Sequence, residues 1–129
     1  MKPLKRILHV EDVPSIQVVT RIALEKLGGF QVLSCSSAQA ALEQAPNFRP
    51  DLILLDVMLP QMGGLELLQR LAPLLDLQQT MVVLLTGQPD DPASPEELRR
   101  LGVRKLMHKP FDPLQLATQL NELWMTEHE

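Results

Sequence analysis

The sequence predicts an α/β domain built on a doubly wound parallel sheet of five strands. Short apolar runs alternate five times with longer amphipathic segments along the 129 residues, which is the pattern of successive strand–helix units. The middle run, residues 52–55, is apolar at every position, as expected of a central strand that helices cover on both faces. Since 129 residues suit one hydrophobic core, we expect residues 1–129 to form a single domain.

The apolar runs predict the strands, and the amphipathic segments between them predict the helices. We expect strands over residues 6–10, 30–34, 52–55, 80–85 and 104–107. We expect helices over residues 14–27, 37–44, 65–72, 95–101 and 113–124.

Residues with strong positional preferences mark the boundaries of the first two helices. Pro14 suits the first turn of the first helix, and Gly28 suits its end. Ser36, with Gln39 three residues later, matches a capping box at the start of the second helix. We expect this second helix to end before Pro46, because proline disrupts a helix interior.

The last three helices have similar signals. Pro73 ends the third helix, and Asp112 can cap the fifth. Ser94 followed by Pro95 marks the start of the fourth helix, and Gly102 lies just past its end. Three prolines prevent an earlier start: Pro89, Pro92 and Pro95. The fourth helix should therefore be short or displaced.

Four of the predicted strands end in chemically useful side chains. Glu11 and Asp12 follow the first strand, and Asp56 follows the third. Thr86 follows the fourth strand and Lys109 follows the fifth. In a doubly wound sheet of order 2-1-3-4-5 these four strands are neighbours, and ligands bind at their carboxyl ends. We therefore expect these side chains to meet at one rim of the sheet.

The chemistry of this rim points to phosphoryl transfer. Three carboxylates brought together repel one another, so the cluster needs a cation, and Mg²⁺ prefers such oxygen ligands. Lys109 supplies a positive charge for a phosphate oxygen or for Asp56, and Thr86 supplies a hydroxyl donor. Asp56 is the preferred nucleophile because it ends the central, most rigid strand.

Composition excludes several other classes of function. The formal net charge of −4, with the twelve Lys and Arg residues scattered along the chain, provides no basic surface for direct binding to nucleic acid. No apolar stretch approaches the roughly 18 residues of a membrane span, so membrane insertion is not expected. The single cysteine, Cys35, excludes an internal disulfide and fits a reducing compartment, which predicts a cytoplasmic protein.

At these residues the sequence strongly resembles the receiver domain of bacterial two-component response regulators. The resemblance extends from about Lys5 to Leu123. Its motifs are the pair Glu11-Asp12, residues 56–64 (DVMLPQMGG), the pair Thr86-Gly87 and residues 109–111 (KPF). Four motifs in this order and at receiver-like spacing are highly specific.

The resemblance implies a flavodoxin-like (βα)₅ fold of order 2-1-3-4-5 in which Asp56 accepts a phosphoryl group. It also implies that Asp12, Asp56 and the backbone carbonyl of Met58 bind Mg²⁺, with Mn²⁺ as a possible substitute. Glu11 would act on the metal through water.

The resemblance further implies that Thr86 and Lys109 contact the phosphoryl oxygens and that the Lys109–Pro110 peptide bond is cis. The switch positions of the family correspond to Thr86 and Leu106. Receivers usually carry tyrosine or phenylalanine where this chain has Leu106. Together with the proline-rich segment before the fourth helix, this predicts an atypical output face.

The function predicted is that of a stand-alone receiver, a phosphorylation-activated switch rather than an enzyme, with at most autophosphorylation and autodephosphorylation activity. Its partners would be a sensor histidine kinase or a histidine phosphotransfer protein, together with a downstream protein target. The chain would be a monomer or a phosphorylation-dependent dimer.

Three other interpretations stay open at this point. The chain can be a piece of a longer regulator or hybrid kinase. It can be a pseudo-receiver that binds proteins without phosphorylation. The third is an aspartyl-phosphate hydrolase, which the apolar Met58 disfavours because such enzymes place a second carboxylate at that position. For the same reason we expect slow self-dephosphorylation, since Met58 cannot orient an attacking water.

Overall fold

A computed structural model of the chain describes residues 2–88 and 91–128 and contains the predicted sheet. Its five strands are parallel and lie in the order β2-β1-β3-β4-β5, which confirms the predicted topology. The strands are β1 (Arg6–Val10), β2 (Gln31–Cys35), β3 (Leu52–Asp56), β4 (Met81–Thr86) and β5 (Val103–His108). The helices are α1 (Pro14–Ile22), the π-helical η1 (Ala23–Leu27), α2 (Ala38–Phe48), α3 (Gly64–Leu71), α4 (Pro95–Arg100) and α5 (Pro113–Glu127).

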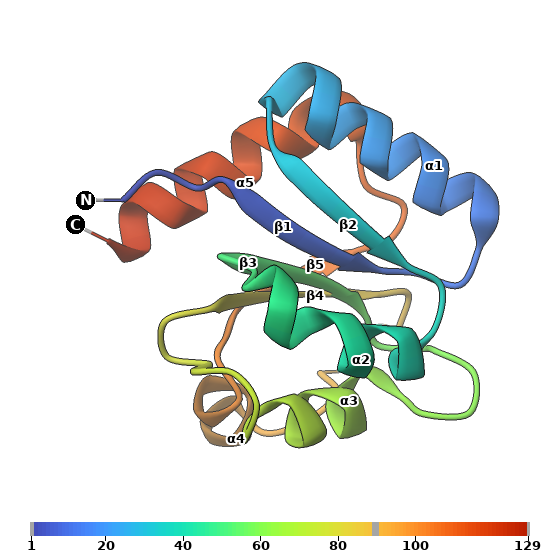
Figure 1. Ribbon diagram of the computed structural model, residues 1–129, viewed down its shortest axis with the longest axis vertical. Helices are drawn as coiled ribbons and strands as arrows, with labels where there is room; N and C mark the ends of the chain where they lie inside the picture. Colours follow the sequence, from blue (N-terminus) through green and yellow to red (C-terminus); the bar gives the residue numbers. More distant parts are fainter. Residues whose placement is uncertain (1, 89–90, 129) are drawn as a thin grey trace.

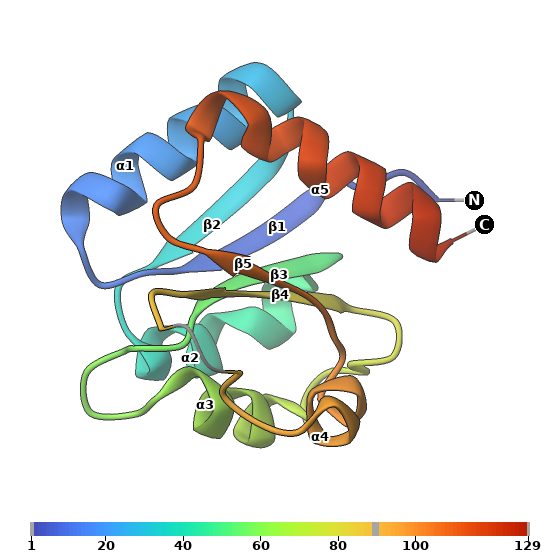
Figure 2. The same cartoon turned by 180° about the vertical axis from the view of Figure 1, so that it is seen from behind.

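The helices form a layer on each face of the sheet. Helices α1 and α5 cover one face, and α2, α3 and α4 cover the other, as Figure 1 and the reverse view in Figure 2 show. Alternate residues of β1 serve the two layers, because Ile7 packs with α5 residues such as Trp124 while Leu8 packs with α2 and α3 residues such as Leu67. Every residue of β3 and β4 is buried, as expected of strands covered on both sides.

The strand register brings the carboxyl ends of the strands to one rim. Val10 of β1 pairs with Leu55 of β3, and Thr86 of β4 pairs with His108 of β5. The ladder continues past the strand ends, since the Lys109 amide donates to the Thr86 carbonyl at 2.9 Å. The residues that follow the strands are therefore fixed by backbone hydrogen bonds as well as by the core.

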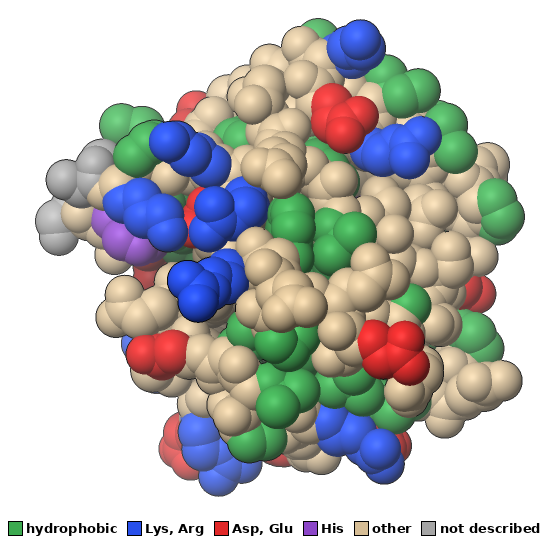
Figure 3. Space-filling view, viewed as in Figure 1, with side chains coloured by type: hydrophobic (Ala, Val, Ile, Leu, Met, Phe, Trp, Pro, Cys, Tyr) green, Lys and Arg blue, Asp and Glu red, His purple; other side chains and the backbone are tan. Residues whose placement is uncertain are grey.

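The opposite, amino-terminal rim is held by one buried carboxylate. Asp51 accepts hydrogen bonds from the backbone amides of Lys5 and Arg6 and pairs with the Lys2 ammonium at 2.6 Å. Burial alone would raise the pKa of Asp51, but the Lys2 ammonium and the two amides outweigh it and lower that pKa. Figure 3 shows Lys and Arg side chains gathered at the end of the molecule where the termini lie. Cationic side chains thus surround the buried Asp51 at this end of the sheet.

The second helix differs from its prediction at both ends. Its N-cap is Ser37, whose hydroxyl accepts from the Ala40 amide at 3.1 Å, and not Ser36. The helix also continues through Pro46 to Phe48. Proline there removes one hydrogen bond near the last turn, and the buried alanines of α2, packed against the sheet, offset that loss.

The other helices follow the predictions with smaller differences. The expected first helix is regular only to Ile22 and then continues as η1, and the residue with positive φ after it is Gly29 rather than Gly28. The fourth helix is short as expected, with the Ser94 hydroxyl accepting from the Glu97 amide at 3.2 Å. Pro89, one of the prolines before it, lies outside the described residues. Within 2–88 and 91–128, no helix is long and apolar enough to cross a bilayer.

Two glycines with positive φ, Gly29 and Gly102, distinguish the destabilisation caused by backbone strain from that caused by steric clash. Gly102 has φ +85, and a Cβ there would lie 2.3 Å from the Leu77 carbonyl oxygen, whereas Gly29 has φ +69 and open space. We expect Gly29→Ala to lower the free energy of unfolding by about 1 kcal/mol and Gly102→Ala to lower it by about 3 kcal/mol or more. Urea denaturation of both variants checks this, and equal losses would contradict the clash at Gly102.

Candidate functional site

An acidic cluster lies at the carboxyl rim of the sheet. Glu11 and Asp12 follow β1, and Asp56 ends β3. One carboxylate oxygen from each of these three residues lies within 4.8 Å of the others. Glu11 and Asp56 are buried and Asp12 is half-buried, so the cluster opens to solvent on the Asp12 side. The structure thus brings together the three carboxylates that the sequence places at the strand ends.

Glu11 is held by contacts at several atoms. Its amide donates to the Cys35 carbonyl at 3.0 Å, which extends the pairing of β1 with β2. Its Oε2 atom accepts from the Val13 amide at 3.2 Å, and its Oε1 atom lies 3.1 Å from the Lys109 Nζ atom. Burial raises the pKa of the Glu11 carboxyl and the neighbouring Asp56 adds to this, although the Val13 amide and Lys109 act in the opposite direction.

Asp56 and Lys109 form the shortest ion pair of the rim. The Lys109 Nζ atom lies 2.5 Å from Asp56 Oδ2, while Asp56 Oδ1 accepts from the Met58 amide at 2.9 Å. Burial would lower the pKa of Lys109, but its bonds to Asp56 and Glu11 outweigh burial and raise that pKa. Lys109 is therefore charged at neutral pH and bridges two carboxylates. The Lys109–Pro110 peptide bond is cis.

Thr86 and Met58 flank Asp56 in different ways. Thr86 is buried, and its hydroxyl oxygen accepts from the Gln88 amide at 3.0 Å. Within the described part of the chain its hydroxyl forms no hydrogen bond with Asp56 or Lys109. Met58 is 62% exposed, so an apolar group lies in solvent beside the cluster. The structure therefore joins Glu11 and Asp56 through Lys109, places the Asp12 carboxylate within 4.8 Å of the other two carboxylates, and leaves Thr86 adjacent to them.

A buried histidine lies behind the cluster. His9 is fully buried in β1, and neither ring nitrogen has a hydrogen-bond partner among the described residues. Burial, reinforced by the Lys109 charge, lowers the pKa of His9 to about 4. The ring is therefore neutral at physiological pH, and it adds no positive charge to a rim where Lys109 already serves Glu11 and Asp56.

Gln17 is a contact of the site that the sequence did not reveal. Its Nε2 atom donates to the Glu11 carbonyl and to the Ser36 hydroxyl, both at 3.2 Å. Gln17 lies six positions after Glu11 on α1, and only the return of this helix across the strand end brings the two residues together. Neither spacing nor composition signals such a contact.

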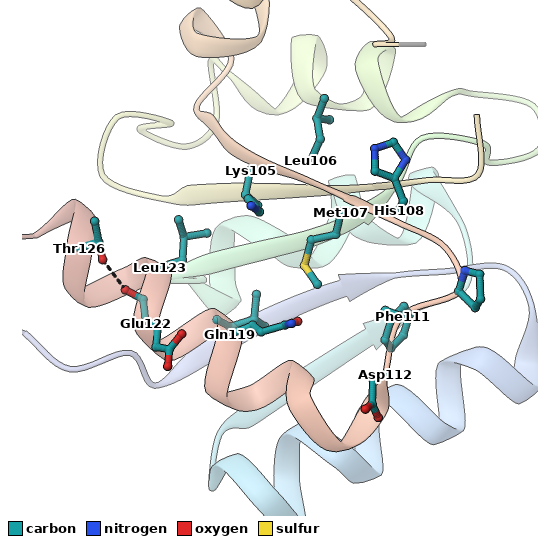
Figure 4. Close-up of a pocket in the computed structure, with 12 residues that line it drawn as sticks. Lys105, Leu106, Met107, His108, Phe111, Asp112, Gln119, Glu122, Leu123 and Thr126 are labelled. Atoms are coloured by element: carbon teal, nitrogen blue, oxygen red, sulfur yellow. Dashed lines mark hydrogen bonds between the residues drawn. The ribbon is translucent and has the colours of Figure 1, made fainter. Parts of the chain in front are cut away.

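The position of Leu106 differs from the rim residues, because it lies on the β5 edge of the sheet. In Figure 4, Leu106 points away from α5, whereas Met107 points towards α5. Leu106 is half-buried and packs against the apolar cluster beneath α2, α3 and α4. A groove of about 570 Å³ lies between β5 and α5 and includes Leu106 and Met107 in its lining.

The acidic cluster fits a hard divalent cation. Mg²⁺ binds proteins through one or two carboxylates and retains several waters, and the half-exposed Asp12 leaves room for those waters. The three carboxylates repel one another, and among the described residues only the Lys109 ammonium group pairs with any of them, so an additional cation is favoured. The donor set contains neither histidine nor thiolate, which a softer metal would prefer.

The fold and the site together are thus a doubly wound parallel sheet with three carboxylates and a lysine gathered at its carboxyl rim. The sequence matches the response regulator receiver domain family over residues 7–121. This chain belongs to that family, whose members are signalling domains of two-component systems rather than conventional enzymes.

Individual relatives agree with this assignment. The chain is 32% identical over 121 residues to the alkaline phosphatase synthesis transcriptional regulatory protein PhoP of Bacillus subtilis, covering 92% of this chain and 48% of that protein. It is 30% identical to sporulation initiation phosphotransferase F of the same organism, covering 84% of each. A CheY-like receiver domain protein from Methanospirillum hungatei superposes with a TM-score of 0.80 at 30% identity, covering 97% of both chains. The chain spans about half the length of several curated relatives it matches.

Removing the Lys109 charge tests the electrostatic balance of the rim. We expect Lys109→Met to lower the free energy of unfolding at pH 7 in EDTA by about 3 kcal/mol, because Glu11 and Asp56 lose their cation. Saturating Mg²⁺ should restore much of this loss by binding the folded state. The exposed Lys105→Met serves as control and should change stability by less than about 0.5 kcal/mol. Equal effects of the two substitutions in urea denaturation would contradict this balance.

Proposed function

We propose that Asp56 accepts a phosphoryl group from a phosphohistidine of a sensor histidine kinase or a histidine phosphotransfer protein. The observation that carries this proposal is the bridging of Asp56 and Glu11 by Lys109 within an acidic cluster at the sheet rim. An Asp56 carboxylate oxygen attacks phosphorus, the bond from phosphorus to the histidine nitrogen breaks, and its electron pair returns to the imidazole.

The other residues of the rim have separate roles in this proposal. Asp12 and Asp56, together with the Met58 backbone carbonyl, would hold Mg²⁺ or its substitute Mn²⁺, and Glu11 would act on it through water. A cation held there would supply positive charge for the transferred group. Lys109 would contact the phosphoryl oxygens and supply a second positive charge.

Thr86 and Leu106 carry the response to phosphorylation in this proposal. The Thr86 hydroxyl keeps its hydrogen for donation, since its oxygen is the acceptor for the Gln88 amide. It is therefore able to donate to a phosphoryl oxygen on Asp56. His108 is the β5 partner of Thr86, and Leu106 lies two residues before it on the same strand. A shift of the Thr86 segment would therefore move β5 and, through Leu106, affect the packing near α4.

We propose that residues 1–129 act as one receiver domain that signals through protein contacts with a downstream target, as a monomer or a phosphorylation-dependent dimer. Both a stand-alone receiver and a receiver within a longer regulator are compatible with the relatives, because phosphotransferase F is covered over 84% of its length and PhoP over 48%. A cytoplasmic location without direct nucleic-acid contact fits this proposal, since the one cysteine, Cys35, is free and the net charge is −4.

A phosphorylation-independent pseudo-receiver is the second candidate. Leu106 in place of an aromatic residue and the six-residue α4 are the observations that favour it. Asp12, Asp56 and Lys109, gathered at the rim, favour the phosphorylated switch instead. Hydrolysis of external phosphate esters is disfavoured, because the exposed Met58 offers no acid or base beside Asp56.

Phosphorylation by acetyl phosphate separates these candidates. We expect intact-mass spectrometry to show one added phosphoryl group when the protein is incubated with acetyl phosphate and Mg²⁺, acetate being the leaving group. EDTA should abolish the addition, and Asp56→Asn should prevent it. Asp76→Asn, at an exposed aspartate of the opposite rim, is the matched control and should be modified like the wild type. A folded protein that gains no mass with Mg²⁺ would favour the pseudo-receiver.

Met58 provides a prediction about the lifetime of the phosphorylated form. An exposed apolar side chain beside Asp56 cannot orient an attacking water, so we expect slow loss of the phosphoryl group. Met58→Asn introduces an amide and should accelerate the loss severalfold, up to about tenfold. Met58→Leu is the control and should decay like the wild type. The decay is followed by intact mass after removal of acetyl phosphate, and an unchanged rate in Met58→Asn would contradict this role.

A further inference from the structure

We propose that Gln17 is a positioning residue that aims the Glu11–Asp12 pair at the metal. This inference rests on the proposed function, because it concerns Mg²⁺ binding at the same rim. Gln17 donates through Nε2 to the Glu11 carbonyl and to the Ser36 hydroxyl, each at 3.2 Å. One side chain on α1 therefore joins the loop after β1 to the loop after β2.

The contact falls where the backbone most needs support. The ladder between β1 and β2 ends at Val10 and Cys35, and one further bond runs from the Glu11 amide to the Cys35 carbonyl at 3.0 Å. Beyond that bond, the side-chain amide of Gln17 donates to the Glu11 carbonyl. The peptide plane between Glu11 and Asp12 is thus fixed by a side chain where strand pairing has stopped.

Charge repulsion makes this restraint significant. Carboxylate oxygens of Glu11, Asp12 and Asp56 lie within 4.8 Å of one another, and the Lys109 Nζ atom bonds only the first and third of these residues. Asp12 is the half-exposed member, without an ion pair in the described part of the chain, so repulsion favours its rotation into solvent. Fixing the peptide that precedes Asp12 keeps its side chain directed at the cluster.

Gln17 itself is anchored for this purpose. Its backbone amide donates to the Val13 carbonyl at 2.9 Å in the first turn of α1. The residue is half-buried against the two loops. Ser36 supplies the second anchor, since it precedes the Ser37 cap of α2 and so lies on a segment whose backbone is already ordered. Residues outside the first coordination shell that orient metal ligands often change affinity about 10-fold to 100-fold.

The test measures Mg²⁺ affinity in Gln17→Met, which preserves side-chain length and removes both hydrogen bonds. We expect the Mg²⁺ dissociation constant, measured by calorimetric titration of the full chain, to rise about tenfold. Gln17→Arg keeps donor groups at this position and should restore most of the affinity. Gln39→Met is the control, because Gln39 is an exposed residue that bonds only Glu43 among the described residues.

Two further readouts separate positioning from a purely structural role. The Mg²⁺ concentration that gives half-maximal phosphorylation by acetyl phosphate should rise in Gln17→Met, while the rate at saturating Mg²⁺ returns close to that of the wild type. The stabilisation by Mg²⁺ in urea denaturation should also shrink. A wild type that binds no Mg²⁺ would overturn the proposed function. A wild type that binds Mg²⁺ with the same affinity as Gln17→Met would overturn the positioning role alone.

Discussion

The rest of this structure depends on one electrostatic constraint, the confinement of three carboxylates at the end of a rigid sheet. Glu11, Asp12 and Asp56 place oxygens within 4.8 Å of one another, although like charges at that distance repel. They remain together because they follow β1 and β3, whose interior positions are fully packed between two helical layers. Unfolding would separate the charges and relieve their repulsion. The stabilisation gained by burying the strands must therefore exceed that repulsion.

Lys109 offsets part of this repulsion. Its ammonium group reaches both Glu11 and Asp56, and the Lys109 pKa is raised despite burial, which shows that the carboxylates outweigh the cost of desolvation. The neutral His9 behind the cluster adds no compensating charge. A negatively charged phosphoryl group on Asp56 would therefore compete for the same ammonium. The Lys109 amide donates to the Thr86 carbonyl, so a backbone hydrogen bond links the two residues proposed to contact the phosphoryl oxygens.

The sequence predicts the parallel sheet and its rim from simple periodic features, and the resemblance to receiver domains adds the strand order. Five apolar runs define the strands, and the polar residue that follows each run must lie at the carboxyl rim once the strands are parallel. Exceptions arise where tertiary packing outweighs local preference. Pro46 lies inside α2 because the buried alanines hold that helix against the sheet, and Ser37 replaces Ser36 as its cap. The bond from Gln17 to Glu11 depends on how α1 crosses the strand end, which no local pattern encodes.

The output side differs from the rim in the strength of its packing. Helix α4 has six residues and buries only Leu98 among them, so few apolar contacts attach it to the sheet. Leu106 packs into the same apolar cluster as Leu98 and has no aromatic ring that could turn from an exposed to a buried position. A displacement of Thr86 would therefore be transmitted by repacking of aliphatic side chains beneath a weakly held helix. In the proposed switch the two parts of the fold would therefore have different requirements, because the rim needs rigidity to hold its charges and the output edge needs a helix that can move.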